Sequence, residues 1–486
     1  MRGRFSLRFI ARYADITEKS GGDMSGKRSI FQNVTFRKLF GAQLIALAGT
    51  GLTTIALALL AYEIAGERAG LVLGTALAIK MIAFIFVAPI VGGLIRPQGR
   101  KTLLVALDVA RAACVLLLPF VTTDWQIYIL IFVLNACSAG FTPTFQSIIP
   151  QIFEDEEDYT KALSMARLAY DLENLLSPTI AAALLLVVGF DVFFVANAAA
   201  FVVSAGLVLS ATMPMVVDMQ DKAMSAREKI AQGFKIYRKT PRLMGMLAMF
   251  LVVAAAGAMV IVNTVVLVRV QFGGGESEVA IAMSAFGLGS LIAALMVPRL
   301  VNRLGDQAVM RRGGWLLALM LVLASYVSQF ELLLLAWFAL GIGYSLVQTP
   351  AGRVLRRSAN DEDLPKLFAA QFTLSHACWL LAYPAAGWLA NVYGFNAAFI
   401  IFAIASILAM LLSQQLWQTD DPAEIEHQHD ALYHDHLHYH GPHHQHEHEG
   451  WEGPEPHRHP HKHEAVRHSH KYVIDGHHTE WPAKTN

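Results

Sequence analysis

Charged side chains are scarce in this sequence: Asp, Glu, Lys and Arg together make up 16% of its 486 residues. Soluble domains usually carry roughly 25%, so the shortage argues against a water-soluble globular protein. Cysteine is also rare, because only Cys114, Cys137 and Cys378 occur, all in apolar runs and none in a C-x-x-C pair. This pattern predicts neither a disulfide framework nor a thiolate zinc site.

The signatures of several other protein classes are missing as well. No G-x-x-x-x-G-K-[ST] phosphate-binding loop occurs, so ATP-driven work is not expected. No nucleophile–base motif stands out, which predicts that the chain is not an enzyme. Residues 1–38 hold nine Lys and Arg but no short apolar stretch with a cleavage site after it, so a signal peptide is not expected. Met24 is an alternative start.

Hydrophobic residues, by contrast, make up 55% of the chain and gather in long runs. A helix needs about 20 mainly apolar residues to cross a bilayer, and lipid cannot satisfy an open backbone. The sequence therefore predicts an all-α integral membrane protein with twelve transmembrane helices. They are expected at about 39–62, 70–95, 102–122, 126–149, 164–188, 191–213, 243–268, 279–301, 313–329, 332–352, 368–391 and 395–415.

Basic residues alternate between the predicted connections. The even-numbered connections hold most of them, seven in the stretch 222–242 alone, whereas the odd-numbered ones hold only Arg68 and Arg269. Because Lys and Arg concentrate in cytoplasmic loops, both termini are predicted to be cytoplasmic, in a bacterial inner membrane. The predicted organisation is a basic segment 1–38, a six-helix bundle 39–213, a linker 214–242, a second six-helix bundle 243–415 and a tail 416–486.

The linker contains a basic amphipathic stretch from Ala226 to Arg238. Such a stretch is typical of a helix lying on the cytoplasmic leaflet. It is equally compatible with an ordinary connection between bundles that carries the positive charge of the inner side. Both interpretations stay open from the sequence.

The two halves of the chain resemble each other at a separation of 205 to 207 residues. Two parallel six-helix repeats with a substrate site between them are the organisation of major facilitator transporters, which this sequence resembles over roughly 36–415. The stretch from Gly92 to Lys101 is similar to that family's signature loop, except that Arg96 replaces an acidic residue. The repeat-matched positions are Gly99 and Gly305, Thr142-Pro143 and Thr349-Pro350, Glu154 and Asp361, Pro178 and Pro384, and Gly189 and Gly394.

Ionisable residues inside the predicted spans are costly, so each one is a functional candidate or part of an ion pair. Lys80 has either a transport or coupling role or an ion-pair partner. Asp108 and Arg111 are spaced i,i+3 and so share one helix face. We expect them to form a structural latch and to supply the partner charges of the signature loop. Asp171 is a candidate proton or cation site.

His376 is the only histidine before the tail, so it is a candidate metal or proton site unless it is simply hydrogen-bonded. In the resembled family the first, fourth, seventh and tenth helices line the central cavity. The candidate cavity residues on these helices are Gln43, Asn135, Asn263, Tyr344 and Gln348.

The tail holds eighteen of the nineteen histidines. Its polar composition cannot bury a core, so we expect it to be disordered without metal. Dense imidazole without sulfur favours Ni²⁺, Co²⁺, Zn²⁺ or Cu²⁺, and many weak sites on one chain raise the local ion concentration. The candidate metal ligands are His434, His436, His438, His440, His443, His444, His446, His448, His457, His459, His461 and His463.

The body and the histidine-rich tail together resemble the nickel-resistance exporters of the NreB type, with Gly70 to Lys80 as the closer match. The body also resembles the exporter branch that includes enterobactin exporters. This resemblance implies export of Ni²⁺ or Co²⁺ from the cytoplasm by proton antiport, with protonation of Asp171 or His376 releasing the metal. We expect a monomer in the lipid bilayer, with no cofactor and no nucleic-acid partner.

Two other interpretations remain from the sequence. The chain is an exporter of an organic solute, such as a siderophore or a drug, whose tail only buffers or senses metal. Alternatively, it is a metal store anchored at the membrane, although a body of twelve spans is then hard to explain.

Overall fold

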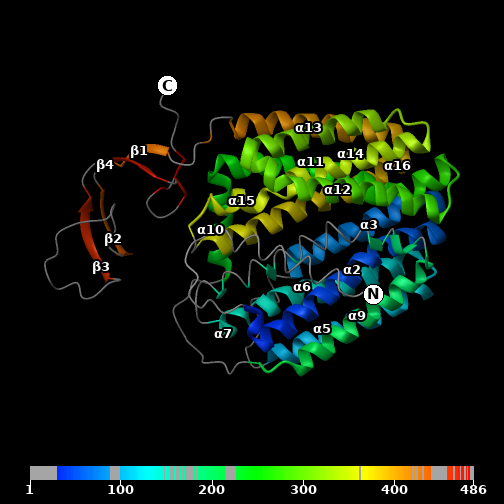
Figure 1. Ribbon diagram of the computed structural model, residues 1–486, viewed down its shortest axis with the longest axis horizontal. Coiled ribbons are helices and arrows are strands. Elements are labelled where there is room, and N and C mark those ends of the chain that lie inside the picture. Colours follow the sequence, from blue (N-terminus) through cyan, green and yellow to red (C-terminus); the bar gives the residue numbers. More distant parts are fainter. Residues whose placement is uncertain are drawn as a thin grey trace.

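The computed structural model shows a helical body with a small strand-containing extension at one end (Figure 1). The body is the membrane protein expected from the apolar runs. The structure describes residues 30–87, 99–146, 148–153, 158–159, 162, 165–166, 169, 180–181, 183–185, 187–213, 226–360, 363–418, 421, 425–429, 432–438, 457–463, 466–470, 472–474, 478 and 480–481.

The N-terminal half begins where the Asn33 side chain accepts a hydrogen bond from the amide of Phe36 and caps the first helix. In Figure 1 this half forms the lower group of helices. Its described helices are α2 (Val34–Ala65), α3 (Ala69–Ile82) with a π-helical continuation Ala83–Val87, α5 (Arg100–Leu117), α6 (Asp124–Gln146), the short α7 (Ile149–Ile152) and α9 (Asp191–Ser210). In this half α9 packs against α2 and α5, and α6 packs against α5 and α3.

The C-terminal half is built around α11, which is buried along almost its whole length and begins with Pro241 at its first position. Because α11 faces lipid so little, it is the central helix of this half. The described helices are α11 (Pro241–Val266) with a π-helical continuation Leu267–Gln271, α12 (Glu276–Leu304), α13 (Asp306–Ala324), α14 (Phe330–Gln348), the short α15 (Ala351–Arg356) and α16 (Leu364–Leu416).

The described residues contain nine segments long and apolar enough to cross a membrane. Two of them, Val34–Val87 and Lys366–Leu416, each cover two of the predicted spans. Within α16 the chain reverses at Gly394, whose φ of 81° suits glycine and separates the eleventh span from the twelfth. The predicted span 164–188 lies largely outside the described residues. The fold is thus the predicted twelve-helix, two-repeat membrane fold.

The linker forms a helix, α10 (Ala226–Lys239), that packs against α16 and α11. Gly233, Ile236 and Tyr237 are buried, so one face of α10 covers the protein. The end of the body that carries α10, α15 and the strands is called the tail end below, and the other end of the body is called the opposite end (Figure 1).

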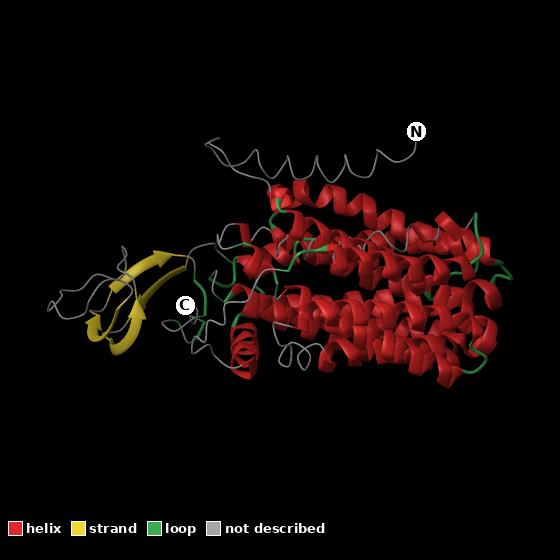
Figure 2. Cartoon of the chain, turned by 90° about the horizontal axis from the view of Figure 1, so that it is seen from below, coloured by secondary structure: helices red, strands yellow, loops and turns green. Residues whose placement is uncertain are grey.

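The described part of the tail contains four short strands, where the sequence analysis expects no regular structure. They are β1 (Ile425–His429), β2 (Leu432–His438), β3 (His457–His463) and β4 (Val466–His470). β1 pairs with β4 and β2 with β3, both antiparallel. The H-x-H repeat has the two-residue period of a strand, which explains how a polar sequence forms this ribbon (Figure 2).

Candidate functional site

The two halves meet where α3 of the N-terminal half packs against α16 and α11 of the C-terminal half. Glycine allows the backbones to touch: a Cβ added at Gly74 would lie 2.5 Å from the carbonyl oxygen of Tyr383, and one at Gly387 would lie 2.2 Å from that of Gly70. Small residues four positions apart are typical of such helix contacts in membranes. We call Gly70, Gly74, Tyr383 and Gly387 the glycine seam.

Asn263 on α11 lies beside the seam and is 1% exposed. Its Nδ2 donates to the carbonyl oxygen of Ala386 at 3.1 Å, which ties α11 to α16. Its Oδ1 has no hydrogen-bond partner among the described residues and faces Gly70 of the other half. The sequence analysis selected Asn263 as a cavity residue, and the structure places it where the two halves touch.

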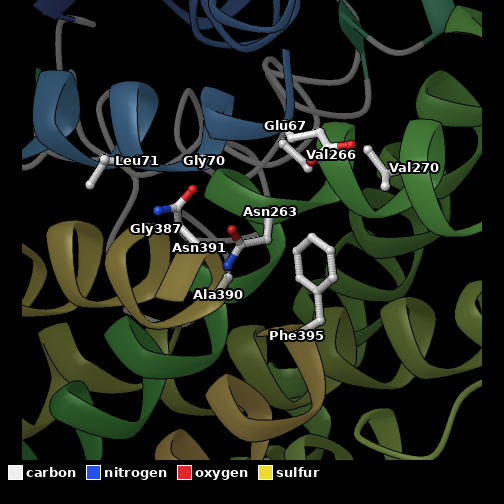
Figure 3. A pocket seen from close by; sticks show the side chains of 10 residues that line it. All are labelled: Glu67, Gly70, Leu71, Asn263, Val266, Val270, Gly387, Ala390, Asn391 and Phe395. Atoms are coloured by element: carbon white, nitrogen blue, oxygen red, sulfur yellow. The ribbon is translucent and has the colours of Figure 1, made fainter. Parts of the chain in front are cut away.

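A cavity of about 140 Å³ adjoins the seam on the side of the opposite end. Figure 3 shows the side chains that surround it, among them Glu67 from the N-terminal half and Asn263 and Asn391 from the C-terminal half. These three side chains contribute the oxygen atoms to a pocket whose other lining residues are apolar. The seam and the cavity together form part of the contact between the two halves.

His376 lies on α16, nearer the tail end than the seam. Its Nδ1 is 2.7 Å from the carbonyl oxygen of Phe372. Since a carbonyl only accepts, Nδ1 donates this hydrogen bond to the backbone of its own helix. The imidazole is 3.9 Å from the Phe372 ring and 5.6 Å from Phe84 of the N-terminal half, measured between ring centroids.

Lys80 is half-buried on α3, one helical turn before Phe84. Residues four apart share a helix face, so Lys80 lies on the face of α3 whose Phe84 meets His376. Phe84 itself belongs to the π-helical segment after α3, and such segments occur frequently at functional sites. Lys80 and His376 are therefore the predicted ionisable residues that the structure brings nearest to the interface of the halves.

Asp108 and Arg111 form the ion pair that their spacing suggests, but they lie inside the N-terminal half. Ser204 donates to Asp108 at 2.7 Å. The Arg111 guanidinium lies between the rings of Phe141 and Phe201, at 4.4 and 4.5 Å from their centroids. The cluster joins α5, α6 and α9, so its geometry suits a pin within one half rather than a point on a path between halves.

The other cavity candidates lie apart from the seam. Asn135 donates to the carbonyl oxygen of Ile131 in its own helix. Gln348 donates to the Tyr344 hydroxyl at 3.1 Å, on a helix that packs against α12 and α13. Gln43 is buried, and its Oε1 has no partner among the described residues. Asp171 lies outside the described residues.

The strand register places tail histidines opposite one another. In the β2–β3 ribbon the facing positions are His434 and His461, His436 and His459, and His438 and His457. Directly opposite residues in an antiparallel pair have Cβ atoms about 4.5–5.5 Å apart, and every second residue shares a face. Three pairs of histidines thus share one face of the ribbon, and His427 faces His468 in the other ribbon.

Among the described residues, no group of three or more His, Cys, Asp or Glu side chains forms a metal-ion site. The register of the strands is what sets the described tail histidines opposite one another. His463 faces Leu432, and the candidate ligands His440, His443, His444, His446 and His448 lie outside the described residues. Apart from the alternation of histidine, no pattern in the sequence indicates this pairing.

Known proteins support the fold. The model of the Major Facilitator Superfamily matches residues 39–268 and 251–431. Among relatives in Bacillus subtilis (strain 168), the uncharacterized MFS-type transporter YfiS is 24% identical over 345 residues, which are 68% of this chain and 80% of that protein. The MFS-type transporter YvqJ, also uncharacterized, is 22% identical over 350 residues, 69% and 82% of the two chains.

Solved structures match the same body. The nucleoside transporter NupG aligns with a TM-score of 0.60 at 14% identity, covering 79% of this chain and 100% of its own. A bacterial homologue of the human lysosomal transporter Spinster, in an inward-facing and unoccupied conformation, gives 0.60 at 12% identity, covering 80% and 98%. The helical architecture, the two repeats and the family match over most of its length show that this chain belongs to the major facilitator superfamily.

Proposed function

We propose that this transporter exports a first-row divalent metal ion, Ni²⁺ first and Co²⁺ next, from the cytoplasm of a bacterium by proton antiport. The observation that carries the proposal is the register of the β2–β3 ribbon, which sets three pairs of histidines opposite one another beside a transporter body. Neutral imidazole suits nickel, cobalt and zinc, whereas Mg²⁺ and Ca²⁺ prefer oxygen. The same metal ion is transported as the substrate and bound by the histidines of the tail.

The charge pattern gives the orientation of this proposal. Lys and Arg cluster at the connections that share the tail end with α10, so this end faces the cytoplasm of the inner membrane. The ribbon then collects the ion on the cytoplasmic side and raises its concentration at the mouth of the path between the halves. Closed backbone contact at the glycine seam keeps the opposite end shut in this state.

In the proposed cycle the two halves rock about the interface of α3 with α16 and α11. We assign the coupling step to the imidazole of His376, because its protonation from the opposite side removes its affinity for a cation. Lys80, on the adjoining face of α3, adds positive charge that repels the ion once His376 is protonated. Asp171 remains a second candidate for the proton step. Opening of the seam then releases the ion toward the periplasm.

A specific observation favours a second candidate, the export of an organic solute. The described interface is lined by aromatic rings, since Phe84 faces Phe372 and Trp379 stacks with Tyr383 at 4.9 Å between centroids. It also lacks, within the described residues, a formed group of three metal-ligating side chains. An apolar path of this kind suits a flat organic molecule, with the tail acting only as a metal buffer or sensor.

Tolerance of cells that lack their native efflux systems separates the two candidates. Export of metal predicts raised tolerance to nickel and cobalt, lost with His376→Gln and only partly reduced when residues 422–486 are removed. Export of an organic solute predicts tolerance to drugs or siderophores and no tolerance to metals. The transport-blocking Gly387→Val variant, discussed below, serves as the expressed but inactive control.

A further inference from the structure

The first anchor of the tail lies directly after α16. Asp421 accepts hydrogen bonds from Arg357 at 2.5 Å and from the Trp417 indole at 2.8 Å, and its other oxygen lies 3.6 Å from Nε of Arg242. The Arg242 side chain is 3% exposed. The carbonyl oxygen of Trp417 also accepts from Arg311 at 3.0 Å. The start of the tail is therefore fixed to α11 and α13 and to the end of α15.

The far end of the tail returns to the same arginine. The ring of Trp481 lies over the Arg242 guanidinium, 4.8 Å from its centroid, and Glu480 lies 3.9 Å from Nζ of Lys239. Tyr472 donates to the carbonyl oxygen of Glu480 at 2.7 Å and its ring is 5.2 Å from Trp481. We call Tyr472–Trp481 the terminal cap.

Four residues of the cap are buried although they come from a polar tail. Tyr472, Val473 and Ile474 are 6%, 2% and 3% exposed, and His478 is 7% exposed against the Tyr472 ring. Tyr472 and Ile474 join the hydrophobic core of the body together with Trp417. Burial of apolar surface stabilises a folded protein by roughly 25 cal/mol per Å². The apolar side chains of the cap therefore favour its docking on the body.

The histidine-rich segment between the two anchors is consequently a closed loop. β1 follows the first anchor and β4 precedes the second, and the two strands pair with each other at the base of the loop. Figure 1 shows the strands at the end that carries α10, and Figure 2 shows them at one end of the helical body. A loop held at both ends keeps its ligands near the body, whereas a tail held at one end spreads them over a larger volume.

The second anchor is also linked to the helix that carries His376. On α10, Tyr237 donates to Gln371 of α16 at 2.5 Å and Gln232 donates to Asp363 at 2.8 Å. Burial raises the pKa of Tyr237 well above its ordinary value, so the phenol remains a donor throughout the physiological range. Lys239 at the end of α10 therefore connects the cap to α16 through contacts that persist.

We propose that the terminal cap is a docking element that closes the histidine loop onto the C-terminal half at Arg242. The loop is thereby held at the mouth of the transport path. Cap docking is an independent structural claim, while its benefit to transport rests on the proposed function. Loss of the cap keeps the histidines in the chain but no longer holds them near the body. The number of metal ions bound therefore stays the same, while the efficiency of transport at low metal concentration falls.

The test compares Trp481→Ala with Trp451→Ala, a matched substitution within the same tail, in the full chain reconstituted in lipid nanodiscs. Hydrogen exchange measured by mass spectrometry reports docking. We expect amides of β1, β4 and the cap to exchange about tenfold faster in Trp481→Ala than in Trp451→Ala, with the number of nickel ions bound unchanged. Removal of residues 472–486 should speed the exchange of the β1 and β4 amides by a larger factor.

Two outcomes separate the cap from the proposed function. Equal exchange in the two tryptophan variants would overturn the cap, whatever the protein transports. Faster exchange in Trp481→Ala without any metal movement in the parent protein would leave the cap standing and remove the export of metal. If both hold, the Trp481→Ala variant should raise KM for nickel about threefold or more, roughly the effective-concentration advantage of a short tether, with kcat unchanged.

Discussion

The N-terminal and C-terminal halves each bury an arginine against an aspartate and aromatic rings, but they use these clusters differently. Arg111 pairs with Asp108 on its own helix and lies between Phe141 and Phe201. Arg242 pairs with Asp421 after α16 and is covered by a tryptophan from the end of the tail. The first cluster links helices within the N-terminal half, while the second connects the C-terminal half to a segment outside the membrane.

This difference shows that the tail is attached to the C-terminal half. Both anchors of the histidine loop use α11 or its neighbours, and the linker helix α10 ties the same region to α16. A change in the loop therefore acts on the C-terminal half. In the proposed cycle the N-terminal half, which is pinned internally, moves against it as a unit. Five changes to the two halves, to their contact and to the tail test this comparison.

Arg111→Met should have the largest effect. It leaves the carboxylate of Asp108, which is fully buried, without its charge partner, and breaking a buried pair in this way costs about 3–5 kcal/mol. We expect a large fall in the thermal unfolding temperature of the purified protein. The double variant Asp108→Leu with Arg111→Met should recover most of the loss, and equal instability of single and double variants would contradict the role of a pin.

Gly387→Val should block transport while the protein still folds. The added side chain would meet the backbone of Gly70 in the other half, so the seam could not close. Overpacking costs about 1–3 kcal/mol, and about 1.4 kcal/mol is a factor of ten in rate. We expect a fall in transport of about tenfold or more in vesicles. Gly206→Val, where a Cβ meets no atom within 4 Å, should transport normally.

Arg242→Met should cost less than Arg111→Met. Asp421 keeps its bonds to Arg357 and Trp417, so the substitution leaves no charge without a partner. We expect a loss of about 1–2 kcal/mol, in the range of an ordinary lost hydrogen bond to a charged group, together with faster trypsin cleavage within the tail. A loss as large as that of Arg111→Met would show that the two clusters have the same role.

Replacement of His434, His436 and His438 by Gln should weaken nickel binding more than replacement of His443, His444 and His446. Both triple variants remove three imidazoles, but only the first removes three facing pairs of the ribbon. We expect the tightest binding step to weaken roughly tenfold, or about 1.4 kcal/mol, by calorimetry. Equal losses in the two variants would mean that composition matters and register does not.

Acidification gives the smallest and most reversible change. Metal binding requires neutral imidazole, and the unperturbed pKa of histidine is about 6.5. Nickel bound to the tail at pH 7.5 should therefore be released as the pH falls through the range of about 6.5 to 5.5. The helical body should keep its circular dichroism over this range. Retention of nickel at the lower pH would point to ligands other than histidine.

The fold could be predicted from the sequence because its determinants are local. Apolar runs set the crossings, basic connections predict the orientation, and the repeat indicates two halves. Asp108 and Arg111 were accessible for the same reason, since three positions along one helix determine their contact. Gly394 marks a boundary between two spans that was correctly placed between 391 and 395.

What the sequence did not reveal depends on contacts between distant segments. The glycine seam needs α3 and α16 to be adjacent, although the spacing of Gly70 and Gly74 was a readable hint. No local sequence pattern indicates the contact between Arg242 and Asp421. Trp481 stands in the sequence only as one aromatic residue in a polar tail. The prediction of a tail without regular structure followed its composition and overlooked its two-residue period.

Nickel flux through everted membrane vesicles tests whether this protein exports metal by proton antiport. Vesicles with an acidic interior should accumulate radioactive nickel when they contain the parent protein. A protonophore should abolish the uptake, and Gly387→Val should not support it. No gradient-dependent movement of nickel, cobalt or zinc, with movement of an organic solute under the same gradient, would contradict it.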